Sequence, residues 1–309
     1  MMKKIHPIFF YTLFLVLSFS FNTHSSQDEE NFAGDETCLE CHEEIYENFW
    51  KNIHGIKGDP RTPAGRSEGF VCESCHGPGI AHAEEGEGGG ILWLSAKSSE
   101  NPEKKNEVCL QCHTKGKVAM WHASEHEMQM LSCADCHNVH RQHPKYLARP
   151  TQTEVCVSCH RKITPLLLRQ SHHPIRERKM QCSDCHNSHG TIADKLIDAQ
   201  DINLKCFECH AKTRGPFLWE HPPAVEDCLT CHVPHGSSQA FLLNARTPYL
   251  CQRCHSNVGH AGELQAKNSG QSGRSVYTAL NNRGFYRGCL NCHLQVHGSN
   301  HPSGKSLLR

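Results

Sequence analysis

The hydrophobic pattern divides the chain into one apolar segment near its start and a long remainder without extended apolar runs. Beyond residues 8–21, the longest apolar runs are four residues, for example at 91–94 and 118–121. Such runs are too short for a membrane-spanning helix, and the alternation typical of strands is almost absent. The pattern predicts short helices, for example over 39–50, where Ile45 and Phe49 share a face.

Glycine and proline segments are expected to link these helices. The acidic stretch GPGIAHAEEGEGGG at 77–90 is predicted to be a flexible loop, and residues 259–277 are a second loop candidate.

The first 25 residues have the features of a signal peptide. Lys3 and Lys4 precede the apolar run at 8–21, and small polar residues and an acidic run follow it. We expect cleavage between Ser20 and Ser26, which leaves a mature domain over 26–309. An uncleaved anchor is the alternative, and a lipid anchor is disfavoured because no cysteine lies near the run. The mature chain is therefore expected in the periplasm.

Composition points to an interior that side chains do not fill. Hydrophobic residues are 37% and aromatic residues 7% of the 309 positions, which is low for a chain of this length. The 32 basic and 32 acidic residues balance, so no electrostatic surface for nucleic acid is predicted.

All 20 cysteines occur in C-x-x-C-H strings, and none is left over. Disulfides would explain an even count in an exported chain, but they do not explain the histidines. Zinc sites do not require histidine directly after the second cysteine either. Covalent haem c requires both, because two thiols attach to the porphyrin and the histidine lies under the iron. The sequence thus predicts ten haems, attached through Cys38, Cys41, Cys72, Cys75, Cys109, Cys112, Cys133, Cys136, Cys156, Cys159, Cys182, Cys185, Cys206, Cys209, Cys228, Cys231, Cys251, Cys254, Cys289 and Cys292.

The histidines are numerous enough to supply two ligands to every iron. The predicted proximal ligands are His42, His76, His113, His137, His160, His186, His210, His232, His255 and His293. The predicted distal ligands are His54, His82, His126, His140, His173, His189, His221, His235, His260 and His297. Four further histidines are spare: His122, His143, His172 and His301.

The distal set follows from a repeat of five two-haem units with central periods of roughly 45–50 residues. In each unit one histidine lies in the gap after the first string, and another closely follows the second. His126 is preferred to His122 because it lies seven residues before Cys133, as His221 lies before Cys228. His173 is preferred to His172 because His-Pro recurs at His221.

Crossed ligation is expected between neighbouring haems. His232 already occupies one face of the haem bound by Cys228 and Cys231, and His235 lies three residues further on nearly the same side of a helix. His235 should therefore reach the iron of a neighbouring haem. The expected fold class is mainly α with much irregular structure, an elongated multihaem cytochrome c in which the haems form the core.

The chain resembles the periplasmic decahaem cytochromes of outer-membrane electron conduits, of the MtrA/DmsE/PioA type. The ten C-x-x-C-H strings, GDETCLECH at 34–42, CESCHGPGIAH at 72–82, WEHPP at 219–223 and HGSNHPSG at 297–304 carry the resemblance. It implies a bis-histidine haem wire inside an outer-membrane β-barrel porin, serving extracellular anaerobic respiration or iron oxidation. It also implies a quinol-linked inner-membrane or periplasmic cytochrome as donor, an extracellular cytochrome or reductase as acceptor, and pentahaem halves at 26–170 and 171–309.

Saturated ligation predicts an electron carrier and not an enzyme, because no iron keeps an open position for substrate. Two alternatives remain at this stage. One is a soluble periplasmic electron shuttle without a porin. The other is a multihaem reductase of nitrogen or sulfur oxyanions, for which the least regular distal candidate, His260, marks the place to look.

Overall fold

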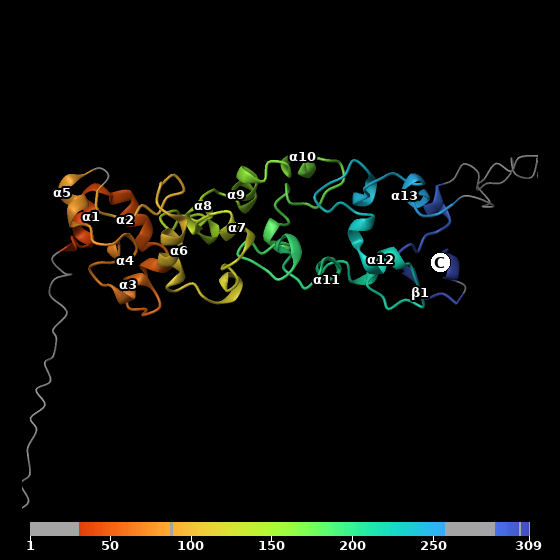
Figure 1. Cartoon of the computed structure of the whole chain (residues 1–309), viewed down its shortest axis with the longest axis horizontal. Helices are drawn as coiled ribbons and strands as arrows, with labels where there is room; N and C mark the ends of the chain where they lie inside the picture. The colour runs from red at the N-terminus through yellow and green to blue at the C-terminus, as the bar shows by residue number, and fades with distance from the viewer. Residues whose placement is uncertain (1–30, 87–88, 257–287, 303, 309) are drawn as a thin grey trace, which may run out of the picture. The chain divides into compact units, whose positions relative to one another are not determined.

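The protein was analysed as a computed structural model, which describes residues 31–86, 89–256, 288–302 and 304–308. Short helices alternate with irregular segments along these residues (Figure 1). The α-helices are α1 (Asp35–Cys41), α2 (Glu43–Trp50), α3 (Pro63–Arg66), α4 (Glu73–His76), α5 (Ile80–Glu85), α6 (Pro102–Leu110), α7 (Glu125–Met128), α8 (Cys133–Cys136), α9 (Gln152–Cys159), α10 (Thr164–Leu167), α11 (Ile202–Phe207), α12 (Pro222–Glu226) and α13 (Tyr249–Gln252).

Single 3-10 turns and one small sheet complete the described structure. The 3-10 turns are η2 (Ile53–Gly55), η3 (Gly116–Val118), η4 (Pro144–Tyr146), η5 (Cys182–Asp184), η6 (Asp194–Leu196), η7 (Ala211–Thr213), η8 (Cys228–Thr230), η9 (Ala240–Leu242), η10 (Cys289–Asn291) and η11 (Gly304–Ser306). Strands β1 (Trp219–Glu220) and β2 (Gly298–Ser299) form an antiparallel pair. None of the helices in the described part has the length and apolarity needed to cross a bilayer. The mainly helical and irregular fold class is therefore confirmed.

Two local predictions need correction, and others fall outside the described residues. The helix expected over 39–50 is broken at His42, whose φ of −118° and ψ of 42° end α1 before α2 begins. The stretch at 77–90 is not simply a loop, because α5 occupies Ile80–Glu85 and carries His82. The signal segment, the loop candidate at 259–277 and His260 lie outside the described residues.

The described residues bury few large apolar side chains, as the composition predicts. Buried hydrophobic residues are Ala64, Val71, Trp121, Leu147, Val155, Leu167 and Leu196. Other large apolar side chains are exposed to solvent, and Ile192 and Phe241 are each 78% exposed. Hydrophobic packing between side chains therefore does not hold this fold together, and local hydrogen bonds carry much of its organisation.

The chain divides into two compact units. The first comprises residues up to Glu43 together with Lys57–Leu92, and the second comprises Glu44–Ile56 together with residues from Trp93 onward. In the first unit the buried Glu73 carboxylate accepts backbone N–H bonds from Ala33, Gly34 and Gly79, at 2.8, 3.0 and 2.6 Å. These bonds tie the start of α1 to α4 and to the turn that precedes α5.

A polar side chain three residues before an odd-numbered C-x-x-C-H string connects that string to the next one. Asn106 accepts the N–H of Cys133 at 2.8 Å, and Asn203 accepts the N–H of Cys228 at 2.9 Å. In the first unit the buried Asp35 accepts the N–H of Cys72 at 2.9 Å in the same way. Each of these side chains fixes the two strings of one two-haem repeat to each other.

After the fourth, sixth and eighth strings the backbone folds back and pairs with the string that directly precedes it. The return places a non-glycine pair at positive φ, and these pairs are Lys145–Tyr146, Lys195–Leu196 and Phe241–Leu242. An isolated bridge then joins the string to the returning chain, between His137 and Leu147, His186 and Ile197, and His232 and Leu243. The same local structure thus recurs three times, although the three pairs differ in sequence and contain no glycine.

Short antiparallel pairings connect segments that carry predicted distal histidines. Strand β1 ends directly before His221, and its Trp219, two residues before His221, pairs with Ser299, two residues after His297. Ser171 pairs with Ser237 at the equivalent positions around His173 and His235, through bonds of 3.1 and 2.7 Å. These pairings bring each gap histidine beside the histidine that follows a later string.

Candidate haem-binding sites

Every C-x-x-C-H string is folded as one helical turn. In all ten, the backbone N–H of the histidine donates to the carbonyl of the first cysteine, over 2.8–3.1 Å. This turn places two thiols and one imidazole together, which is what covalent haem attachment requires. None of the 20 cysteines is in a disulfide. Within the described ranges, no group of three or more histidine, cysteine or acidic side chains is arranged to hold a metal ion.

The first cysteines of the two strings in each repeat lie next to each other. Burial raises the pKa of Cys206 to about 12, with the Cys228 thiol contributing, and raises that of Cys251 to about 11, with Cys289 contributing. A hydrogen bond with Cys156 lowers the pKa of Cys182 to about 7. Hydrogen bonds with Cys72 and Cys109 likewise lower the pKa of Cys38 and Cys133 respectively. The first thiols of the two strings in one repeat are therefore neighbours.

Eight of the string histidines each face one predicted distal histidine. The ring centroids are 6.0–6.3 Å apart in every pair. The pairs are His42 with His82, His113 with His54, His137 with His189, His160 with His126, His186 with His235, His210 with His173, His232 with His297 and His255 with His221.

These separations fit a metal ion between the rings. Metal–imidazole bonds of about 2.0 Å on opposite faces of one ion put the two ring centroids about 6 Å apart. Aromatic pairs in direct contact occupy a wider range, about 4.5–7 Å. Eight pairs confined between 6.0 and 6.3 Å therefore fit bis-histidine ligation better than ordinary ring packing.

The pairs cross between repeats in both directions. His173 follows the fifth string and faces His210 of the seventh, whereas His235 follows the eighth string and faces His186 of the sixth. His126 and His189 face partners in the same reciprocal manner, as do His221 and His297. Only His82 faces the histidine of its own repeat, His42. Neighbouring repeats of the second unit thus exchange ligand candidates.

The proximal histidines of the even-numbered strings have their Nδ1 atoms at backbone carbonyls. The distances are 2.6–3.1 Å, to the carbonyl oxygens of Leu92, Lys145, Lys195, Phe241 and Ser306 for His76, His137, His186, His232 and His293. The left-handed pairs described above supply three of these carbonyls. An Nδ1–H donated to a carbonyl fixes the tautomer and leaves Nε2 free for the iron.

Three gap histidines make an equivalent Nδ1 bond to the backbone carbonyl that directly precedes another distal candidate. Nδ1 of His126, His173 and His221 lies 2.8 Å from the carbonyl oxygens of Ser188, Pro234 and Val296 respectively. Each of these carbonyls belongs to the residue directly before another distal candidate, His189, His235 or His297. One hydrogen bond therefore links two ring pairs at each crossing.

Burial keeps several of these imidazoles neutral. Burial, and then the facing imidazole, lowers the pKa of His54, His189, His235 and His297 below its ordinary value. Burial likewise lowers the pKa of His137, against the opposing effect of its carbonyl bonds. A neutral imidazole has the free nitrogen lone pair that iron requires.

The spare histidines have other partners. His122 is 77% exposed and its Nδ1 lies 2.9 Å from the Glu127 carboxylate, whereas His126 makes the ring pair. Nε2 of His172 lies 3.2 Å from Glu177, and its neighbour His173 faces His210. Nδ1 of His143 lies 3.0 Å from the carbonyl of Leu147.

For two predicted distal ligands the described ring pairs give no test. His260 lies outside the described residues, and none of the eight ring pairs described above includes His140, which stays a prediction. Haem attachment at the second and tenth strings, with His76 and His293 as ligands, stays a prediction from the C-x-x-C-H spacing.

Three buried side-chain nitrogens at or near the ring pairs have no hydrogen-bond partner. Among the described residues, the buried nitrogen and oxygen atoms without a hydrogen-bond partner are Nδ1 of His54, Nδ1 of His82 and Nε1 of Trp121. His54 and His82 belong to ring pairs, and the Trp121 ring lies 6.5 Å from that of His189. The exposed apolar side chains and the separations within the ring pairs, not these Nδ1 atoms, indicate that the residues present fit haem.

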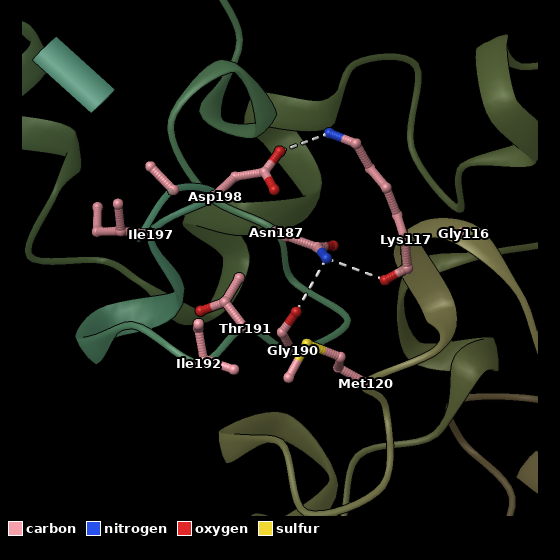
Figure 2. A pocket seen from close by; sticks show the side chains of 10 residues that line it. Gly116, Lys117, Met120, Asn187, Gly190, Thr191, Ile192, Ile197 and Asp198 are labelled. Carbon is pink, nitrogen blue, oxygen red and sulfur yellow. Dashed lines mark hydrogen bonds and ion pairs between the residues drawn. The ribbon is translucent and has the colours of Figure 1, made fainter. Parts of the chain in front are cut away.

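A cavity of about 450 Å³ lies between the segment around η3 and the chain after the sixth string. Figure 2 shows the Asn187 amide donating to the carbonyls of Lys117 and Gly190, both at 2.9 Å, with the Lys117 ammonium 2.8 Å from Asp198. The backbones also approach closely, because a Cβ at Gly190 would overlap the carbonyl oxygen of Met120. These contacts hold the segment that carries His189.

Sequence reasoning missed several residues that position the ligands. The side chains of Asp35, Asn106 and Asn203 share one position relative to their strings, and that recurrence could have revealed them. The dipeptide His-Gly at 189–190 and 235–236 was a similar signal, since a Cβ at Gly236 would overlap the Leu166 carbonyl. The left-handed pairs carry no such signal, because they are not glycine.

Two families of haem proteins match parts of the chain. Residues 172–215 and 221–260 match the family described as "Doubled CXXCH motif", and residues 72–150 match "Cytochrome c-type protein NrfB-like". The chain is also 41% identical over 285 residues to a protein of Shewanella baltica (strain OS185) described as "Multiheme cytochrome MtrA", which covers 91% of this chain and 84% of that protein. The C-x-x-C-H strings are thus sites of covalent haem c attachment.

Proposed function

The chain belongs to the family of the multihaem c-type cytochrome MtrA and is an electron carrier, not an enzyme, and we propose that it conducts electrons along ten bis-histidine haems. The eight ring pairs at 6.0–6.3 Å are the observation that carries this proposal. The thioether cysteines and proximal histidines would be those of the ten strings. The distal ligands would be the eight facing histidines together with His140 and His260.

The protein would contribute rigid, saturated ligation. When bound, haem c supplies a one-electron Fe(III)/Fe(II) couple. Two neutral imidazoles held through their Nδ1 bonds would leave no position for substrate and would change little in geometry between oxidation states. Neighbouring thiols, such as Cys206 and Cys228 within one repeat, would set porphyrin edges close together. Both features favour electron transfer over catalysis.

Crossed ligation would also make the haems part of the fold. A haem held by His210 and His173 connects two repeats, and the one held by His186 and His235 connects the same two. Because apolar packing between side chains is sparse, these iron bonds would supply much of the missing core. Haem loading and folding should therefore be coupled.

The cellular role that we propose is conduction across the outer membrane. An N-terminal signal would export the chain to the periplasm, where a quinol-linked inner-membrane or periplasmic cytochrome would reduce it. A β-barrel porin would surround it, and an extracellular cytochrome or reductase would accept the electrons in extracellular respiration. In iron oxidation the flow would be reversed. The resemblance of the chain to outer-membrane conduit cytochromes supports this role.

Electron paramagnetic resonance of the oxidised protein, with haem content measured on the same sample, tests the ligation. We expect ten haems per chain and only low-spin signals. Near-parallel ligand rings, as in His137–His189 at 13°, should give a different low-spin signal from inclined rings, as in His126–His160 at 56°. A high-spin signal from a fully loaded chain would reveal an open iron and favour the reductase alternative.

Liposomes that contain a trapped redox dye separate a conduit from a periplasmic shuttle. The protein should allow an external reductant to reduce the dye only when it is reconstituted together with a porin partner. Dye reduction with the cytochrome but without the porin, or no reduction with both, would contradict the conduit. Co-purification of the chain with a β-barrel protein is the matching test in cells.

A further inference from the structure

Four backbone carbonyls occupy equivalent positions, each in the residue directly before a predicted distal histidine. At one of the four, the hydrogen-bond donor is different. The carbonyls of Ser188, Pro234 and Val296 each lie 2.8 Å from Nδ1 of a gap histidine. At the fourth position, Val139, the donor is the side-chain amide of Asn52 at 2.6 Å. Asn52 belongs to the first repeat, whose gap histidine, His54, lies two residues further along the chain.

Asn52 is held in place by both ends of its amide. It is 5% exposed, and its Oδ1 accepts the backbone N–H of His54 at 2.8 Å at the start of η2. Its Nδ2 occupies the Val139 carbonyl, so that Nδ1 of His54 is buried without a hydrogen-bond partner. The His54 ring still faces His113, with ring centroids 6.0 Å apart.

Two other repeats have serine at the position of Asn52, and the repeat of His221 has Trp219 there. Ser124 and Ser171 lie two residues before His126 and His173, as Asn52 lies before His54. Ser124 accepts the Glu127 N–H at the start of α7 and is too short to compete for the Ser188 carbonyl, which His126 reaches. Asparagine at this position therefore donates to the carbonyl that, in the repeats with serine, accepts from the gap histidine.

A ligand histidine that donates its outer N–H to a carbonyl becomes a more basic ligand, and this favours the ferric over the ferrous state. A ligand without that bond is less basic and favours the ferrous state. We propose that Asn52 is a positioning residue that raises the reduction potential of the haem between His54 and His113, by taking the carbonyl that His54 would otherwise use. This proposal rests on the bis-histidine ligation proposed above.

The consequence is one site along the electron path that is easier to reduce than its three counterparts. The counterparts are the haems between His126 and His160, between His173 and His210, and between His221 and His255. An electron would dwell longest at the raised site. This shift in reduction potential needs no change of axial ligand, because it follows from the hydrogen bonding of one ligand, His54.

Asn52→Ser in the haem-loaded full chain is the direct test, because serine retains the capping oxygen and is the residue that two sister repeats have at this position, Ser124 and Ser171. Spectropotentiometric titration should show one of the ten one-electron components moving to lower potential. We expect about a tenfold change in its reduction equilibrium, which is ~59 mV for a one-electron couple. The reciprocal variant Ser124→Asn should move a different component to higher potential.

His54→Met identifies the haem concerned, since methionine has no N–H to donate. In that background Asn52→Ser should have no effect on any potential. Unchanged potentials in the single variant, with ten haems and low-spin signals retained, would overturn the proposal and leave bis-histidine ligation standing. A shift that persists in the His54→Met background would also overturn it. A high-spin haem in the unaltered protein would instead overturn the ligation itself.

Asn52→Gly covers the case in which serine disturbs folding, because glycine is also a favoured capping residue. Both variants remove the amide donor and should give shifts of the same sign. Opposite signs would mean that the potential responds to packing around η2 and not to the freed carbonyl, and the proposal would fail.

Discussion

Nδ1 of His173 lies 2.8 Å from the carbonyl oxygen of Pro234, the residue before His235. His173 itself faces His210, and His235 faces His186, so this single bond connects the ligand candidates of two haems. His172, the adjacent residue, has its ring nitrogens near the Arg169 carbonyl and the Glu177 carboxylate. The geometry thus separates two neighbouring histidines into different roles.

Replacing these histidines one at a time should give opposite results. In His173→Ala one iron loses an axial nitrogen, so that one of the ten haems becomes high-spin in the ferric protein. In His172→Ala, the matched control, all haems should stay low-spin. Electron paramagnetic resonance with haem quantification measures both. The assignment of His173 fails if the alanine variant at 172 is the one that produces the high-spin signal.

Gly190 is predicted to be intolerant of a side chain. Its φ is +117°, and a Cβ would overlap the carbonyl oxygen of Met120. Gly190→Ala should lower stability by about 1–3 kcal/mol through backbone strain and displace His189 from His137. A lower unfolding midpoint, followed by Soret absorbance, and weaker ligation of one haem are expected.

Gly58→Ala is the control for backbone strain alone. Gly58 also has positive φ, +77°, but no atom lies within 4 Å of its ideal Cβ. We expect a smaller loss of stability and unchanged haem spectra. Equal effects in the two variants would show that the approach of the Met120 carbonyl does not matter.

The sequence was most informative where chemistry repeats. The strings reveal the thiols and proximal histidines because covalent haem attachment fixes their spacing. The surplus of histidines, sorted by repeat, selected His126 over His122 and His173 over His172, and the ring pairs involve the selected residues. The position of each histidine within its repeat is a local property, so a comparison of the repeats was enough to rank these candidates.

The sequence was least informative about which ligand faces which string. That pairing is a long-range property, since His235 faces a histidine 49 positions earlier and passes over the nearer His210. Local backbone geometry was also hidden. Lys145 and Lys195 adopt positive φ although lysine has no such preference, because their carbonyls are needed at His137 and His186. The break at His42 likewise follows from the string and not from helix propensity.

Asn203 should show a graded response to substitution. Its amide accepts from the Cys228 N–H and donates to the Val225 carbonyl at 2.8 Å. Asn203→Ala leaves both backbone groups unpaired and should cost about 1–3 kcal/mol, whereas Asn203→Asp keeps the acceptor, as Asp35 does for Cys72. Unfolding midpoints should rank the original protein first, the aspartate variant second and the alanine variant last. Equal loss in both variants would show that the bond to Cys228 contributes nothing.

Acid should weaken the contact between the segment around η3 and the chain after the sixth string. The hydrogen bond from Lys117 lowers the pKa of Asp198 below its ordinary value of about 3.9. A depressed folded-state pKa means that the pair stabilises the protein above the unfolded-state pKa. That contribution is lost as pH falls through the folded-state pKa. Asp198 and Lys117 side chains are 33% and 61% exposed, so we expect only about 0.2–1 kcal/mol at neutral pH.

A double-mutant cycle with Asp198→Asn and Lys117→Met isolates this interaction. Each single variant should lose the same small free energy of unfolding at neutral pH, and the double variant should lose no more than either. Below the folded-state pKa the coupling between the two positions should vanish, because the carboxyl is then neutral in both folded and unfolded chains. A coupling that stays constant as the pH falls would assign the stabilisation to packing against the cavity of Figure 2 and not to charge.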